Sequence, residues 1–110
     1  MTFFASDNGP EGPSQDPGSA GPFRGRKRSL YEGGVRVPAF VHFPSKIRGG
    51  GSIDAPGVTS DYLPTVLRAV GLERPDNRPL DGRDLWPLIR GVSERRGAPI
   101  GFVSRQQRSW

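Results

Sequence analysis

The sequence predicts an α/β fold made of two apolar strands and two short helices. Both strand candidates, residues 2–5 and 37–43, are apolar runs bounded by turn-forming residues, a pattern typical of buried strands. Both helix candidates begin with Asp-x-x-Pro and end at a glycine. Asp favours the position before a helix, Pro is tolerated in the first turn, and Gly favours the C-terminal cap.

The first strand candidate leads into a long irregular segment. Residues 9–22 contain eight glycines or prolines, so this segment is predicted to be a loop. Glu32-Gly33-Gly34 is predicted to be a turn, because paired glycines permit positive φ without steric cost. The second strand, residues 37–43, is expected to be buried on both faces, with Pro38 tolerated near its start. A loop over 46–57 and a third strand within 98–103 complete this part of the prediction.

The stronger helix prediction covers residues 62–70. Four apolar side chains there follow the spacing of one helical face: Leu63, Val66, Leu67 and Val70. Asp61 is placed to cap this helix and Gly71 to end it. The second helix repeats the pattern, with Asp84 as cap, Pro87 three residues later and Gly91 as terminator.

Composition indicates a chain that is marginal by itself. A length of 110 residues suffices for one small domain and is too short for two. With 16 glycines and 12 prolines the apolar core is small, so a piece of something larger is expected. The absence of cysteine excludes disulfides and thiolate metal sites. No apolar run approaches the roughly 20 residues needed to span a bilayer.

A cluster of basic residues follows the long loop. The net charge of +5 fits an anionic partner, and ordinary solubility explains it equally well. A basic cluster can hold a sulfate, a phosphate or a nucleic-acid backbone, and a solvated loop is the alternative. Two aromatic residues flank the cluster and give weak support for base stacking. The cluster consists of Arg24, Arg26, Lys27 and Arg28, and the flanking aromatics are Phe23 and Tyr31.

Asp7 and Asn8 are the candidate metal ligands. A carboxylate and an amide carbonyl at the end of a strand suit a hard cation such as calcium, and strand ends are where open α/β sheets bind ligands. Asp-Asn-Gly is also favoured in turns for local reasons, so both interpretations stay open on these residues alone. His42, the only histidine, is interpreted as structural, and no serine lies beside a candidate base.

Four motifs in order resemble the formylglycine-dependent sulfatases, in particular the arylsulfatase and N-acetylgalactosamine-6-sulfatase group. The similarity extends from Phe3 to about Phe102. Each motif is weak alone, and their order and spacing make the resemblance specific. The motifs are SDNGP (6–10), GPFRGRKRSLYEGGVRVP (21–38), VTSDYLPT (58–65) and RPLDGRDLWPLIRG (78–91).

The resemblance implies a fold like that of alkaline phosphatase, a large mixed sheet flanked by helices. Residues 1–110 would form part of the catalytic domain, loop-rich over 9–36 and with strands and helices over 37–103. Asp7 and Asn8 match the Asp-Asn pair that binds the active-site calcium, and Lys27 matches the lysine that contacts the substrate sulfate. Glu32, Gly33, Gly34 and Arg36 match a turn whose role is taken as architectural.

The sequence departs from this family in lacking the Cys-x-Pro-x-Arg segment that yields formylglycine, together with the remaining calcium ligands. The chain by itself is therefore expected to be inactive, with an N-terminal part of the domain missing. The resemblance implies a sulfate ester substrate, with sulfated carbohydrates among the candidates. Neither a nucleic-acid partner nor a membrane span is expected. Family members usually mature in secretory, lysosomal or extracytoplasmic spaces, and this sequence carries no address.

Three alternatives remain at this stage. A phosphate or phosphonate hydrolase of the same superfamily would need further His and Asp ligands, which one histidine does not supply. A basic nucleic-acid-binding module would use the cluster of residues 24–28 and bind in a salt-sensitive way. A non-catalytic sulfatase remnant would keep the fold elements without turnover.

Overall fold

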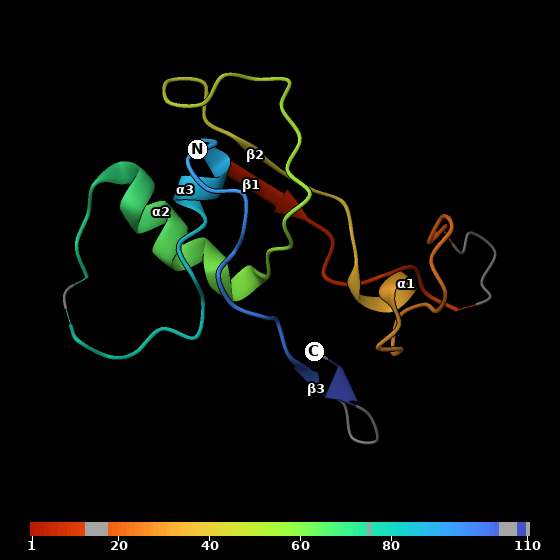
Figure 1. The fold of residues 1–110 in the computed structure, drawn as a ribbon. Helices are drawn as coiled ribbons and strands as arrows, with labels where there is room; N and C mark the ends of the chain where they lie inside the picture. Colours follow the sequence, from red (N-terminus) through yellow and green to blue (C-terminus); the bar gives the residue numbers. More distant parts are fainter. Residues whose placement is uncertain (13–17, 75, 104–107, 110) are drawn as a thin grey trace. The chain divides into compact units, whose positions relative to one another are not determined.

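The computed structural model describes residues 1–12, 18–74, 76–103 and 108–109 (Figure 1). The chain divides into two compact units. The strand unit comprises Met1–His42 together with Gly101–Trp110, and the helix unit comprises Phe43–Ile100.

The strand unit contains both predicted apolar strands. Strand β1 (Thr2–Ala5) pairs antiparallel with β2 (Ala39–His42), so that Thr2 lies opposite His42 and Ala5 opposite Ala39 (Figure 1). The second strand begins only after Pro38, which has no N–H to donate to the ladder. The strand predicted within residues 98–103 is reduced to β3 (Phe102–Val103), which pairs antiparallel with β4 (Arg108–Ser109).

The predicted burial of these strands is wrong for this chain. Phe4 is 53% exposed and Phe40 is 55% exposed, although both belong to apolar runs. The two rings stack on each other with centroids 5.1 Å apart. Among the described strands β1 and β2 pair only with each other. A two-stranded sheet has no second layer to cover its apolar side chains, so they stay accessible to solvent.

The glycine pair after Glu32 forms a short helix instead of the predicted positive-φ turn. Helix α1 (Glu32–Val35) contains Gly33 and Gly34, and both are buried without positive φ. A Cβ on Gly33 would meet the backbone oxygen of Gly25, and one on Gly34 would meet that of Ser29. Close approach of neighbouring backbone, rather than backbone flexibility, therefore explains the need for glycine here.

Replacing Gly33 with alanine is expected to lower the free energy of unfolding by about 1–3 kcal/mol, because the added methyl group overpacks a backbone contact. Gly12→Ala is the matched control, since a Cβ at Gly12 meets nothing within 4 Å. Urea unfolding of both variants measures the difference. An equal midpoint for the two variants would show that the Gly33 contact can relax without cost.

The helix unit contains the predicted helices. Helix α2 (Tyr62–Val70) has the predicted bounds and ends at Gly71, whose φ of 74° is left-handed. It follows a short 3₁₀ turn, η1 (Thr59–Asp61). Helix α3 (Trp86–Ile89) is a single turn that packs against α2 (Figure 1).

Helix α2 buries a different face from the predicted apolar stripe. Leu63 is 53% exposed and Val70 is 42% exposed, whereas Thr65 and Ala69 are buried. Thr65 is fully buried, and two hydrogen bonds satisfy its hydroxyl there. The hydroxyl donates to the Asp61 carbonyl at 2.6 Å and accepts the Leu85 N–H at 2.8 Å. A polar hydrogen-bonding position, not the apolar stripe, thus lies at the centre of this unit.

Asp61 occupies the predicted N-cap position of α2, but its side chain does not cap the helix. Its side chain makes no capping hydrogen bond to α2 and instead accepts the N–H groups of Val58 and Arg83, at 3.0 and 2.6 Å. The Arg96 guanidinium completes the carboxylate's partners, with Nη2 2.8 Å from Oδ1 and Nε 3.1 Å from Oδ2. Asp84, by contrast, does accept the first N–H of its helix, from Trp86 at 2.8 Å.

Burial acts to raise the pKa of the Asp61 carboxyl, but the hydrogen bonds from Arg96, Arg83 and Val58 outweigh it, and the net pKa is lowered. Asp61 is fully buried and the Arg96 side chain is 7% exposed. The pair joins segments 35 residues apart in sequence. It therefore holds the end of η1 against the chain that follows α3.

No helix of the described residues has the length and apolar character needed to cross a membrane.

Candidate functional site

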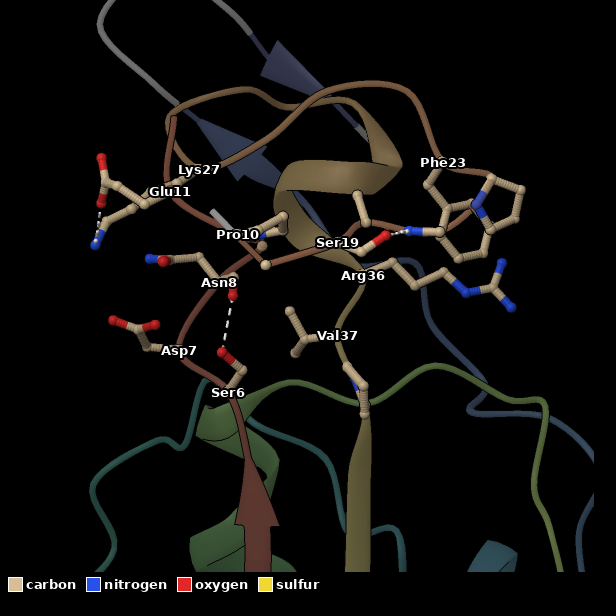
Figure 2. Close-up of a pocket in the computed structure, with 16 residues that line it drawn as sticks. Ser6, Asp7, Asn8, Pro10, Glu11, Ser19, Phe23, Lys27, Arg36 and Val37 are labelled. Carbon is tan, nitrogen blue, oxygen red and sulfur yellow. Dashed lines mark hydrogen bonds and ion pairs between the residues drawn. The ribbon is translucent and has the colours of Figure 1, made fainter. Parts of the chain in front are cut away.

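A pocket of about 700 Å³ lies in the strand unit, where the chain leaves β1 and enters β2. Asp7, Asn8 and Lys27 all line it, together with residues of the long loop and the segment that precedes β2. Figure 2 shows these three side chains along one side of the pocket, with Arg36 and Phe23 on the other. The structure thus brings the three sequence-predicted site residues to one cavity.

Asp7 and Asn8 follow directly after β1. The Ser6 hydroxyl donates to the Asn8 carbonyl at 2.8 Å, and the Gly9 N–H donates to the Gly34 carbonyl at 2.9 Å. These backbone contacts fix the turn and tie it to α1. The side chains of Asp7 and Asn8 make no hydrogen bond or ion pair within the described part of the chain. Their oxygens are therefore available to a ligand.

Lys27 is held at the pocket by its backbone. Its N–H donates to the Pro10 carbonyl at 3.0 Å, which joins the basic cluster to the segment just after Asn8. The next residue, Arg28, has a φ of 76°. Only a few per cent of non-glycine residues adopt such a left-handed backbone.

Glu11 is a pocket residue that sequence reasoning did not find. Its Oε2 lies 3.2 Å from the Lys27 ammonium and its Oε1 lies 3.3 Å from the Arg28 guanidinium. The hydrogen bond from Lys27 is the main cause that lowers the pKa of the Glu11 carboxyl. No sequence signal pairs Glu11 with Lys27, because the two are 16 residues apart and separated by a long loop.

Arg24 and Arg26 of the cluster, and Arg36 outside it, have partners of their own. The Arg24 guanidinium lies 4.1 Å from the centroid of the Tyr31 ring, and that of Arg36 lies 4.6 Å from the Phe23 ring. Arg26 donates to the Glu11 carbonyl at 3.1 Å. One face of each flanking ring is thereby covered by a cation, which leaves less ring surface for stacking on nucleic-acid bases.

The donor set fits part of a calcium shell. Calcium prefers roughly six to eight oxygen ligands, and Asp7 and Asn8 offer hard oxygen donors on one pocket wall. The described residues contain no group of three or more His, Cys, Asp or Glu side chains that could hold a metal. These two residues can therefore supply part of a site whose other ligands come from elsewhere.

Comparison with known proteins decides the family. The sulfatase family profile matches residues 1–72, which include the pocket and both strands of the first sheet. The chain belongs to the sulfatase family. Sulfatases act on sulfate esters and bind metal ions, so the pocket and its oxygen donors lie in a segment shared with such enzymes.

Individual sulfatases match over most of this chain. The steryl-sulfatase of Mus musculus is 42% identical over 101 residues, which cover 86% of this chain and 16% of that protein. The N-acetylgalactosamine-6-sulfatase of Sus scrofa is 42% identical over 92 residues, covering 81% and 17%. Arylsulfatase A of Bos taurus is 40% identical, covering 94% and 20%. The chain thus spans between about one sixth and one fifth of the length of these sulfatases.

Proposed function

We propose that this chain forms one side of a sulfatase active site, with Asp7 and Asn8 as calcium ligands and Lys27 as a contact to the sulfate group. The observation that carries the proposal is that these three side chains line one pocket. Two of them offer unengaged oxygens, and the third offers a cation. A sulfate group between a bound cation and Lys27 would be neutralised from two sides.

Lys27 would act as a fixed positive charge. Cleavage of a sulfate ester leaves negative charge on the sulfate oxygens and on the departing alcohol oxygen. An ammonium group held by the pocket stabilises that charge without having to reorganise during the reaction. Its backbone bond to Pro10 supports this role, since it ties Lys27 to the turn that carries Asp7 and Asn8.

The calcium ion, when bound, would supply Lewis-acid polarisation of a sulfate oxygen. Asp7 would contribute a negative charge and Asn8 a neutral amide oxygen to its shell. Both side chains follow the last residue of β1, so a short strand positions them together. The absence of other partners for these two side chains among the described residues supports this assignment.

The rest of the site would lie outside these 110 residues. The sequence contains no cysteine, so a formylglycine nucleophile must come from elsewhere, and we infer that the chain is inactive by itself. The half-exposed Phe4 and Phe40 support a larger, alkaline-phosphatase-like sheet that would cover β1 and β2. Residues 1–110 would then be part of one catalytic domain.

The substrate would be a sulfate ester, and its alcohol part is set by residues beyond Lys27 and the calcium ligands. Relatives named for steryl, aryl and N-acetylgalactosamine-6-sulfate substrates share this segment at similar identity. The segment therefore serves recognition of the common sulfate group. The long loop, of which Gly18 to Pro22 line the pocket, would contact the alcohol.

A chimera tests the proposal. The segment of mouse steryl-sulfatase aligned with this chain is replaced by the corresponding residues of this chain. The chimera is expected to hydrolyse an aryl sulfate ester and to lose turnover when calcium is removed with a chelator. Turnover that persists without calcium, in a chimera that folds, would contradict the assigned metal role.

A further inference from the structure

Glu11 already places an anion where the proposed function puts the substrate sulfate. Its two carboxylate oxygens contact different cations, Oε2 with Lys27 at 3.2 Å and Oε1 with Arg28 at 3.3 Å. Figure 2 shows the Glu11–Lys27 pair on the same side of the pocket as Asp7 and Asn8. A sulfate group can likewise present two oxygens from one centre to two cations.

We propose that Glu11 is an internal occupant of the anion site, which an incoming sulfate group must displace from Lys27. This inference rests on the proposed function, because it takes Lys27 as the sulfate contact. Glu11 would compete with weakly binding anions and hold the Lys27 ammonium at the pocket when no substrate is present. It would thus be a specificity-determining residue of the site.

The contacts of Glu11 would allow its carboxylate to leave Lys27 while its backbone stays in place at the pocket. Its carbonyl accepts a hydrogen bond from Arg26, and the preceding Pro10 carbonyl accepts the Lys27 N–H. The carboxylate itself has only the two cations as side-chain partners among the described residues. The Glu11 side chain is 48% exposed, so its ion pairs are weak and its rotamers exchange rapidly.

Arg28, the second cation that contacts Glu11, supports the same inference. Its side chain is 81% exposed, and Glu11 is its ion-pair partner among the described residues. Once the carboxylate turns away, Lys27 and Arg28 would both be free to contact one anion. The site would then carry two uncompensated positive charges, where the Glu11 carboxylate had offset one of them.

The test is a titration of the 110-residue chain with sodium sulfate at constant ionic strength. Amide NMR signals of Lys27 and Arg28 report binding. Glu11→Gln is expected to bind sulfate about fivefold more tightly than the parent, because two weak ion pairs no longer compete. Glu73→Gln is the matched control, since it removes the same charge from an exposed residue without ion pair or hydrogen bond in the described chain.

Variants of Lys27 separate this inference from the proposed function. If Lys27→Met weakens sulfate binding and also cancels the gain of Glu11→Gln, both stand. If Lys27→Met weakens binding but Glu11→Gln leaves it unchanged or weaker, Glu11 is not a competitor and the inference is overturned alone. If sulfate binding is absent in all variants, the inference is overturned alone, and if binding is insensitive to Lys27→Met, both fail. Amide dispersion equal to the parent's verifies folding, and Glu11→Asp, which keeps the charge on a shorter arm, is expected to lie between parent and Glu11→Gln.

Discussion

Replacing Lys27 with alanine in the chimera is expected to lower turnover of the sulfate ester by about 100-fold, the scale seen when one pre-organised charge-stabilising group is removed. The lost ammonium would no longer offset charge on the sulfate oxygens. The free energy of unfolding should change little, because the Lys27–Glu11 ion pair is partly exposed and screened by solvent. Turnover and urea unfolding, measured on the same protein, distinguish the two effects.

The control for this prediction is Arg48→Ala, which removes a cation from an exposed loop of the helix unit. It should leave turnover near the parent value. Lys27→Arg retains the charge and should recover part of the activity, since a guanidinium can still contact an anion. Turnover and stability falling together in Lys27→Ala would indicate a structural lysine.

Replacing Asp61 with alanine is expected to lower the free energy of unfolding by about 3–5 kcal/mol, because it leaves the buried Arg96 guanidinium without its partner. The loss would remove much of the stability of a chain this size. Asp76→Ala is the matched control: Asp76 also pairs with arginines, but its side chain is 34% exposed, so a much smaller loss of stability is expected. Urea unfolding of the 110-residue chain measures both.

The same pair predicts a pH dependence. The pKa of Asp61 is lowered in the folded chain, so its contribution is fully present above the ordinary carboxyl pKa of about 3.9. It is lost as the pH falls below that value and through the folded pKa. Asp61→Asn should flatten this part of the stability curve. A parent whose stability does not fall between pH 4 and pH 2 would contradict the assignment.

The sequence predicted the helices and strands well where the signal is local. The bounds of α2 and its glycine terminator follow from residues adjacent in the chain, and β1 and β2 follow from apolar runs. The burial of the strands was predicted wrongly. Burial depends on other layers that pack over a strand, and an apolar run by itself does not show that such a layer is present. Phe4 and Phe40 remain half exposed for that reason.

Contacts between distant residues explain the other differences. Asp61 has the local features of a helix cap, yet Arg96, 35 residues later, takes its carboxylate. Gly33 and Gly34 were expected in a positive-φ turn, but the need for glycine comes from backbone atoms of residues 23–29. Glu11 was missed for the same reason, since its contact with Lys27 joins residues that are distant in the sequence.

The placement of Asp7, Asn8 and Lys27 in one pocket agrees with the motif-based expectation of a shared site. The motifs identified the three residues. The structure adds that all three line one pocket, and that the side chains of Asp7 and Asn8 have no partner among the described residues. Calcium binding by Asp7 and Asn8 and the contact of Lys27 with sulfate stay predictions, which measurements of activity can test.

Calcium activation of the chimera tests those roles most directly. Asp7→Asn keeps the shape of the side chain but removes one negative charge from the proposed calcium shell, so the calcium concentration for half-maximal turnover should rise at least about tenfold. Asp54→Asn, at an exposed aspartate of the helix unit, should leave the activation curve unchanged. Identical curves for parent and Asp7→Asn would show that Asp7 does not bind the ion, and the proposed site would fail.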